Sequence, residues 1–259
     1  MAGLWISFLR RLAEQQKING GKSAMNYPLT PIAMIHSPFK EKFGTPRQPD
    51  LTPSVHARID FIPEFATPEA VRDLEGFSHL WLIFLFHQNW QKGWKPTVRP
   101  PRLGGDQRVG VYASRSPFRP NPIGLSAVKL LSIRCDKGNV SLEVQGADLI
   151  DGTPILDIKP YIPYGDSIPN ATGGFAEQLP RPTLQVEFAD IAREQLAQYR
   201  KETPELEMML QETLSLDPRP AYRHNKGDTK EYGVLLDRYN ICWHVVGVKV
   251  VVSRIDLVA

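Results

Sequence analysis

The sequence of 259 residues has little of what marks several common protein classes. It contains only two cysteines, Cys135 and Cys242, and neither has a second Cys or a His nearby. This excludes a zinc ribbon, gives no disulfide framework and favours a reducing, cytosolic setting. The longest apolar run, residues 80–86, is far too short to span a membrane.

The sequence also lacks the fingerprints of the common nucleotide-dependent enzymes. It has no Gly-x-Gly-x-x-Gly after a strand, no Walker loop, no Gly-x-Ser-x-Gly and no His pair at metal-ligand spacing. A Rossmann-type cofactor site is therefore not expected, and no metal ligand is predicted. The formal net charge is only +3, so any signal for a nucleic-acid partner has to be local.

Proline is the residue in excess, with 23 residues against a usual share of about 5%. The prolines lie singly or in pairs between short apolar runs, which favours short strands and fixed turns. Strands are predicted at residues 32–35, 57–62, 79–87, 108–113, 126–133 and 140–146, with a short helix at 68–74 capped by Thr67. Five or more such strands predict a β-barrel or a sandwich.

The pattern changes near both ends of the chain. In residues 1–25 an apolar stretch precedes Arg10 and Arg11, the reverse of the order in a secretory signal, so these residues are interpreted as an N-terminal extension. After residue 183, helices are predicted at 189–200 and 205–216, and strands at 231–237, 241–246 and 248–255. We therefore predict a β domain over residues 26–183 and a small α+β domain over 184–259.

Basic residues are concentrated in one stretch of the chain. Residues 95–129 contain seven Lys and Arg residues and one Asp, a net charge of +6 in a chain of net +3. Arginines held by prolines in loops can present fixed guanidinium groups to phosphate or carboxylate. A solvated basic surface is the alternative, but the intervening prolines and glycines favour a binding loop.

This stretch ends in the rigid, polar segment Arg-Ser-Pro-Phe-Arg-Pro-Asn-Pro-Ile-Gly at residues 115–124. Its three prolines fix their own φ angles and force the residues before them into extended conformations. Such a loop can hold polar groups in place, and the amide of Asn121 can both donate to and accept from an adenine. A proline-stiffened corner between strands is the structural alternative.

A second polar segment, residues 148–161, is rich in acidic residues. Asp148, Asp151 and Asp157 follow a predicted strand, and Asp-Gly-Thr-Pro at 151–154 is a turn sequence. The turn by itself accounts for Gly152 and Pro154. A ligand that carries both an amine and a carboxylate would nevertheless need an acidic and a basic segment together.

Four segments together resemble the TsaA-like, or TrmO, family. They are residues 115–126, residues 148–161, Phe-Ser-His-Leu-Trp at 77–81 and Asp-Pro-Arg-Pro-Ala-Tyr-Arg at 217–223. The resemblance covers residues 27–255. It implies a mainly β protein with a single β-barrel ahead of the small α+β domain, and a cytoplasmic homodimer. It also implies that the protein uses S-adenosyl-L-methionine to methylate N6 of threonylcarbamoyl-adenosine next to the tRNA anticodon.

The resemblance further implies which residues contact the cofactor. They are Arg47, Gln48, Pro49, His87, Gln88, Arg115, Leu125, Ile150, Asp151, Gly152 and Thr153. In this assignment Arg115 pairs with the methionine carboxylate, Leu125 covers the adenine, and Asp151 takes the amine or a ribose hydroxyl. For His87, a histidine satisfied at the end of a strand is the alternative.

Methyl transfer requires the attacking nitrogen to lie about 3 Å from the methyl carbon, in line with sulfur. Asn121 and Asp151 are the catalytic candidates, because either could orient that nitrogen or handle its proton. Contacts with the phosphates of the tRNA anticodon loop are predicted for the basic stretch from Lys95 to Arg119, which includes Arg99 and Arg102. Further tRNA contacts are predicted for Arg219, Arg223 and Lys226, and Phe118, Tyr161 or Tyr164 could stack on a base. Core packing is the alternative for the aromatic residues.

Two other functions remain compatible with the sequence. The barrel could bind S-adenosylmethionine or RNA without turnover, or it could methylate a small molecule or a protein. The basic loops favour RNA over the second of these substrates.

Overall fold

The computed structural model describes residues 27–136, 138–180, 182–220, 223–224 and 230–258. All elements described below belong to the unit formed by residues 31–259. The extension predicted at residues 1–25 lies outside the described residues. None of the described helices is long and apolar enough to cross a membrane.

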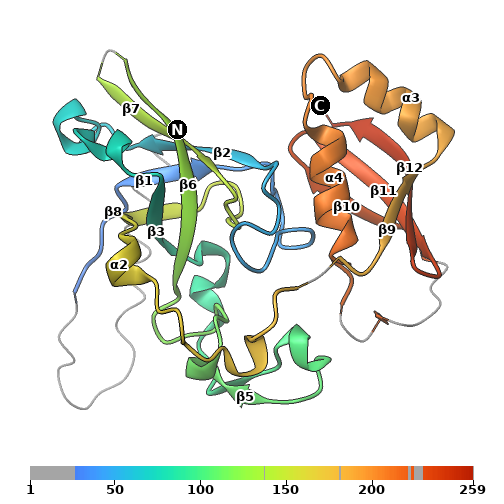
Figure 1. The fold of residues 1–259 in the computed structure, drawn as a ribbon, viewed down its shortest axis with the longest axis horizontal. Helices are drawn as coiled ribbons and strands as arrows, with labels where there is room; N and C mark the ends of the chain where they lie inside the picture. Colours follow the sequence, from blue (N-terminus) through green and yellow to red (C-terminus); the bar gives the residue numbers. More distant parts are fainter. Residues whose placement is uncertain (1–26, 137, 181, 221–222, 225–229, 259) are drawn as a thin grey trace. The chain divides into compact units, whose positions relative to one another are not determined.

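Six antiparallel strands form a closed barrel (Figure 1). In barrel order they are β1 (Ala33–His36), β2 (His56–Phe61), β7 (Asn139–Gln145), β6 (Ile123–Asp136), β3 (His79–Leu85) and β8 (Pro154–Pro160), and β8 pairs back with β1. Alternate side chains point into the barrel, where Ile35, Ile59, Leu82 and Leu142 are fully buried. The predicted mainly β fold with a barrel is confirmed.

The strand that closes the barrel, β8, is not apparent from the sequence pattern. It runs from Pro154 to Pro160 and carries charged residues, so it resembles a loop. The register between β3 and β8 shifts, which leaves Leu156 as an extra residue on β8. This bulge allows Ile155 and Ile158 to pack on the core three positions apart, and the alternation typical of a strand is lost.

The helix predicted at residues 68–74 is not a continuous helix. Two 3-10 turns, η1 (Pro68–Val71) and η2 (Leu74–Gly76), take its place. Asp73 lies between them with a φ of 64°, a left-handed conformation that a right-handed helix cannot contain. Thr67 does precede the first turn, but its side chain makes no capping hydrogen bond.

The strand predicted at residues 108–113 is much shorter than expected. Only β5 (Val109–Gly110) is extended, paired with β4 (Thr97–Val98), and the chain then forms the turn η5 (Val111–Ala113). Prolines on both sides of β4 remove backbone donors and limit the pairing to two residues. Further short elements are η3 (His87–Lys92), η4 (Pro101–Leu103), α2 (Pro163–Asp166) and η6 (Gly174–Ala176).

The C-terminal part has its own sheet and hydrophobic cluster. Its strands lie in the order β10 (Tyr232–Leu236), β11 (Tyr239–Val246), β12 (Lys249–Leu257) and β9 (Gln185–Phe188), with β9 parallel to β12. Helices α3 (Asp190–Tyr199) and α4 (Leu206–Ser215) contribute to the same cluster, which encloses Trp243. The predicted helices and the strands β10 to β12 are confirmed, and β9 is an additional strand.

The connection between β1 and β2 packs on this C-terminal cluster. Phe39 belongs to the same buried cluster as Trp243. Phe43 stacks on Tyr232 and on Trp243, with ring centroids 6.2 Å apart in each case. The connection contains residues 47–49, which were predicted to bind the cofactor, so this packing restricts where they can lie.

Candidate cofactor and substrate site

The rigid segment at residues 115–124 leads directly into β6. Gly124, the second residue of β6, lies against the ring of Phe84: a Cβ atom on Gly124 would be 2.2 Å from Phe84 Cζ. The Pro122 carbonyl accepts a hydrogen bond from the Phe86 amide at 2.8 Å. These contacts anchor the segment at the end of β3.

Arg119 holds the same segment from within. Its Nη1 atom donates hydrogen bonds to the carbonyls of Val111 at 3.2 Å and Ser114 at 2.6 Å. The guanidinium also lies 5.7 Å from the centroid of the Tyr112 ring. Arg119 therefore stabilises the loop, and its contact with tRNA stays a prediction.

Two of the predicted cofactor-binding segments meet at Arg115. Its Nη1 atom donates a hydrogen bond to Gln48 Oε1 at 2.6 Å, and Gln48 Nε2 donates to the Arg47 carbonyl at 2.6 Å. Arg115 is exposed, and no acidic side chain of the described residues lies within 4.0 Å of its guanidinium. Its charge is therefore available to an anionic group of a ligand.

Asp148 is a candidate site residue that the assignment by resemblance missed. Its carboxyl group accepts a hydrogen bond from Ser126 Oγ at 2.6 Å. Burial raises the pKa of Asp148 to about 6, while the Ser126 hydrogen bond and the charge of Arg115 act in the opposite direction. Asp148 thus couples the acidic segment to Arg115. The available sequence signal is an Asp between two apolar residues, Ala147 and Leu149, both of which are buried.

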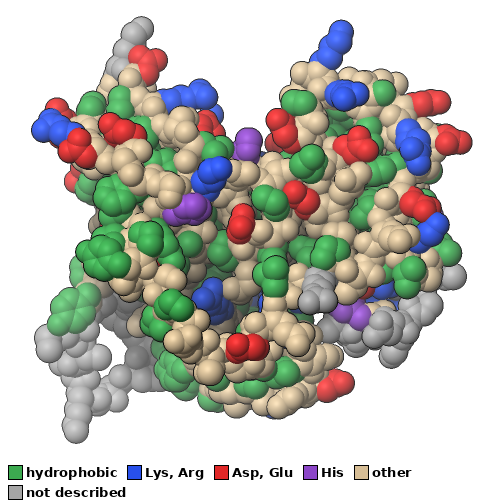
Figure 2. Space-filling model, viewed as in Figure 1, with side chains coloured by type: hydrophobic (Ala, Val, Ile, Leu, Met, Phe, Trp, Pro, Cys, Tyr) green, Lys and Arg blue, Asp and Glu red, His purple; other side chains and the backbone are tan. Residues whose placement is uncertain are grey.

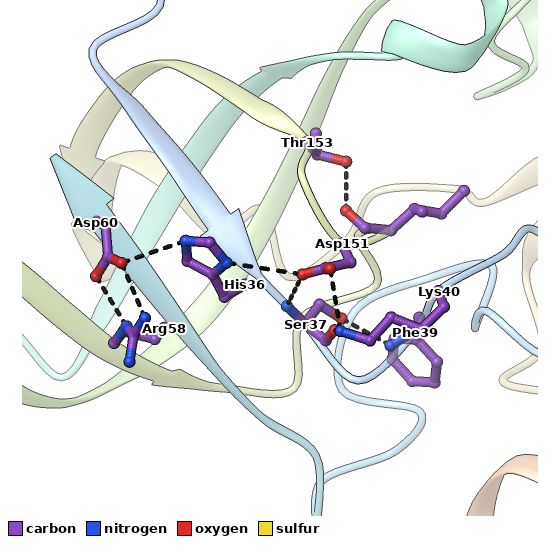
Figure 3. Close-up of polar contacts among 9 residues, drawn as sticks. His36, Ser37, Phe39, Lys40, Arg58, Asp60, Asp151 and Thr153 are labelled. Carbon is purple, nitrogen blue, oxygen red and sulfur yellow. Dashed lines mark hydrogen bonds and ion pairs between the residues drawn. The ribbon is translucent and has the colours of Figure 1, made fainter. Parts of the chain in front are cut away.

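Asp151 lies beside the end of β1 and is already bound by protein groups (Figure 3). Its Oδ1 atom accepts a hydrogen bond from the Ser37 amide at 2.9 Å, and its Oδ2 atom accepts one from Lys40 Nζ at 3.0 Å. His36 Nδ1 lies 3.9 Å from Oδ1. The carboxylate therefore fixes the turn to β1. Its roles toward the cofactor and the target nitrogen stay predictions.

The rest of this turn is held mainly by backbone contacts. Gly152 has a φ of 70°, and its amide donates to the Ile35 carbonyl at 2.9 Å. Thr153 is buried, and its Oγ1 atom donates to the Ile150 carbonyl at 2.6 Å. Turn geometry thus accounts for Gly152 and Thr153, and a ligand contact would be an additional role.

The other predicted cofactor residues lie at the ends of barrel strands or in connections. His87 and Gln88 begin η3 directly after β3 and Phe86, and burial lowers the pKa of His87. Leu125 is 51% exposed and alternates along β6 with the inward-facing Ser126. An exposed leucine on a barrel strand offers apolar surface to a flat ligand group.

The described contacts divide the predicted site into two groups. On one side Arg115 donates a hydrogen bond to Gln48 and its charge acts on Asp148. On the other side Asp151 interacts with Lys40 and His36. No hydrogen bond or ion pair between described side chains joins the two groups. Asn121, the second catalytic candidate, is exposed within the rigid segment.

Arg219 is not the surface residue that the sequence predicts. Its side chain is 2% exposed, and its Nε and Nη2 atoms donate to the two carboxylate oxygens of Asp217 at 2.7 and 2.8 Å. A guanidinium enclosed in this bidentate pair cannot reach a phosphate of tRNA, so the predicted direct contact is wrong. The pair instead lies near Arg47: burial lowers the pKa of Arg47, and the charge of Asp217 opposes that shift.

The remaining predicted RNA-binding residues differ in their surroundings. Arg102 donates hydrogen bonds to two backbone carbonyls at and after η6, whereas Arg99 and Arg223 are exposed. Lys226 lies outside the described residues. Acidic and basic side chains are interspersed on the face shown in Figure 2, so an RNA-binding surface has to be a local one.

Sequence models of known families match both parts of the chain. The tRNA-methyltransferase O N-terminal domain matches residues 34–167, and the TrmO C-terminal domain matches residues 181–258. The chain belongs to the tRNA-methyltransferase O family. These matches confirm the family that the four sequence segments resemble.

Members of the TrmO family are similar to this chain over most of its length. The tRNA (adenine(37)-N6)-methyltransferase of Escherichia coli (strain K12) is 47% identical over 214 residues, 83% of this chain and 91% of that protein. A Pseudomonas aeruginosa protein provisionally named an S-adenosylmethionine-dependent methyltransferase is 42% identical over 222 residues, 85% of this chain and 93% of that protein. A crystal structure of TrmO from Pseudomonas aeruginosa has a TM-score of 0.75 at 34% identity and covers 90% of this chain and 99% of that chain.

Proposed function

We propose that this protein is an S-adenosylmethionine-dependent methyltransferase that modifies N6 of adenine 37 in tRNA, as the names of its relatives indicate. The finer proposal is that this adenine already carries a threonylcarbamoyl group. The observation that carries the proposal is the meeting of Arg115 with Gln48 beside Asp148. Three segments that are distant in the sequence thereby supply charged and polar groups to one place.

The chemistry of these residues fits the cofactor. The exposed guanidinium of Arg115 can bind the methionine carboxylate, and exposed Leu125 can cover the adenine ring. The residues that would complete the binding site are Arg47, Gln48, Pro49, His87, Gln88, Ile150, Asp151, Gly152 and Thr153. When bound, S-adenosylmethionine supplies an electrophilic methyl group.

The protein's own part in the reaction is to position the attacking nitrogen, because methyl transfer needs no covalent nucleophile from the enzyme. Asn121 is exposed and can hydrogen-bond an adenine edge. The carboxylate of Asp151 is engaged by Lys40 and Ser37, although it retains lone pairs for a further donor. We therefore place Asn121 ahead of Asp151 as the group that orients the target.

Transfer of a labelled methyl group tests the proposed function. The protein is incubated with methyl-labelled S-adenosylmethionine and tRNA that carries threonylcarbamoyl-adenosine, and the labelled nucleoside is identified after digestion. We expect label at N6 of adenine 37. Binding of the cofactor without label in tRNA would instead support the non-catalytic module, and label in a protein or small molecule would support the other alternative.

Three further features are proposed from the family resemblance. The barrel domain comprises residues 26–183 and the C-terminal domain residues 184–259, a division supported by the start of β9 at Gln185. The protein acts as a cytoplasmic homodimer, and Arg99, Arg102, Arg119, Arg223 and Lys226 contact tRNA. Light scattering of the purified protein tests the dimer, and a mass equal to one chain would contradict it.

A further inference from the structure

Lysines and exposed aromatic residues occur together on three loop segments that are joined by backbone hydrogen bonds. The Lys95 amide donates to the Phe118 carbonyl at 3.1 Å, and the Val111 amide donates to the Pro96 carbonyl at 3.0 Å. The pairing of β4 with β5 continues this contact. Residues 94–96 are thereby held beside η5 and the rigid segment.

Two ammonium groups lie over the ring of Phe118. Lys95 Nζ is 4.4 Å from the ring centroid, and Lys42 Nζ, from the connection between β1 and β2, is 6.0 Å from it. Burial lowers the pKa of Lys42, and the positive charges of Lys92 and Arg47 lower it further. Lys92 therefore belongs to the same group of cations.

These lysines have no acidic partner inside the described part of the protein. None of Lys42, Lys92 and Lys95 has a carboxylate of a described residue within 4.0 Å. Other lysines do: Lys40 and Lys159 lie 3.0 and 2.8 Å from Asp151 and Asp157. Positive charges gathered without a counter-charge favour an anion that comes from outside the chain.

Large aromatic side chains are exposed on the same segments. Trp94 is 54% exposed and precedes Lys95, and Tyr112 is 71% exposed in η5. Exposed flat rings beside cations are typical of surfaces that bind unpaired nucleic acid, because the rings stack on bases while the cations contact phosphates. An acidic peptide would need the cations but not the exposed rings.

We propose that Lys42, Lys92, Lys95, Trp94, Tyr112 and Phe118, the aromatic–basic surface, bind the unpaired loop of the tRNA substrate. The lysines contact its phosphates, and Trp94 and Tyr112 stack on its bases. This inference rests on the proposed function and adds Lys42, Lys92, Trp94 and Tyr112 to the residues that the sequence predicts. It also places the RNA next to the Arg47 and Arg115 side of the cofactor site.

Binding of a labelled anticodon stem–loop RNA to the full-length protein tests the inference. Affinity is measured at several salt concentrations for wild type, Lys92→Gln/Lys95→Gln and Trp94→Ala. Lys129→Gln is the control, because Lys129 is also exposed but lies farther along β6, paired with His79 at the opposite end of β3. Thermal unfolding and S-adenosylmethionine affinity are measured for each variant to detect damage to the fold.

We expect Lys92→Gln/Lys95→Gln to bind the RNA at least tenfold more weakly, with a salt slope reduced by about 1.4, because two phosphate contacts of about 0.7 each are lost. Trp94→Ala should weaken binding about tenfold and leave the slope unchanged, because stacking releases no counterions. Lys129→Gln should match wild type. A duplex without a loop should bind more weakly than the stem–loop.

Three results would overturn the inference. If wild type methylates tRNA but both surface variants bind the stem–loop as well as wild type does, the surface is wrong and the proposed function stands. If wild type neither binds nor methylates tRNA, the proposed function fails as well. A folded variant that loses cofactor affinity and not RNA affinity would also assign these residues to a different ligand.

Discussion

The two sides of the predicted cofactor site differ in how their charges are satisfied. Arg115 is exposed and its partner is the neutral amide of Gln48, whereas Asp151 is bound by Lys40 and Ser37. The family resemblance assigns both Arg115 and Asp151 to cofactor binding. Of these two charges, only that of Arg115 has no counter-charge within 4.0 Å among the described residues. We therefore infer that Arg115 recognises the ligand carboxylate, while the 150–153 turn mainly shapes the site.

Replacing Arg115 should have the largest effect on the cofactor. Arg115→Ala removes the charge that pairs with the methionine carboxylate, and we expect S-adenosylmethionine affinity to fall about 100-fold, or about 3 kcal/mol, in a calorimetric titration. Arg134→Ala is a matched control, because Arg134 is an exposed arginine on β6 whose guanidinium is 3.9 Å from Glu143. Similar losses in the two variants would contradict a specific role for Arg115.

Gly124→Ala should disturb the same side of the site through packing. The new Cβ would meet the Phe84 ring at 2.2 Å, and Phe84 is 5% exposed in the barrel core. We expect the free energy of unfolding to fall by about 2 kcal/mol in urea denaturation. Gly110→Ala has no atom within 4 Å of its new Cβ and should be close to neutral. Equal stability of the two variants would show that the Gly124 contact relaxes freely.

Asp148 should make stability depend on pH. Its pKa is raised to about 6 in the folded protein, so the folded state holds the proton more tightly than the unfolded state. This contribution is complete below about pH 4 and is lost as the pH rises through about 6. Relative to Asp148→Asn, wild type should therefore lose about 2 kcal/mol between about pH 4 and pH 7 in urea unfolding. A difference that is constant with pH would show that the pKa of Asp148 is not raised in the folded protein.

Breaking the ion pair on the other side should have the smallest effect. Lys40 and Asp151 are each about a third exposed, so Lys40→Met should cost no more than about 1 kcal/mol of stability. We expect cofactor affinity to change less than about threefold, roughly 0.7 kcal/mol, by the same titration. A loss of cofactor affinity as large as that of Arg115→Ala would show that the two sides of the site contribute equally to cofactor binding.

Features with a local signature were accessible from the sequence. The C-terminal helices and strands, the hairpin of β6 and β7 and the rigid segment depend on residues that are neighbours in the chain. The strand β8 was not accessible, because the bulge at Leu156 changes the spacing of its buried residues. The helix predicted at 68–74 failed for a comparable reason, since the left-handed conformation of Asp73 is not dictated by residue type.

The same distinction between local sequence signals and long-range packing applies to the site residues. Arg115 and Gln48 could be named by resemblance, but their contact depends on how the β1–β2 connection packs on the C-terminal cluster. The sequence predicts that Arg219 is exposed, whereas in the structure it forms a bidentate pair with Asp217. Charge patterns alone do not show which cations already have a buried partner.

A crystal structure with S-adenosylhomocysteine would show most directly whether Arg115 binds the ligand carboxylate. We expect that carboxylate about 3 Å from the guanidinium of Arg115, with Lys40 still paired to Asp151. A ligand carboxylate bound away from Arg115, or an amine that displaces Lys40 from Asp151, would contradict the proposed division of roles between the two sides of the site.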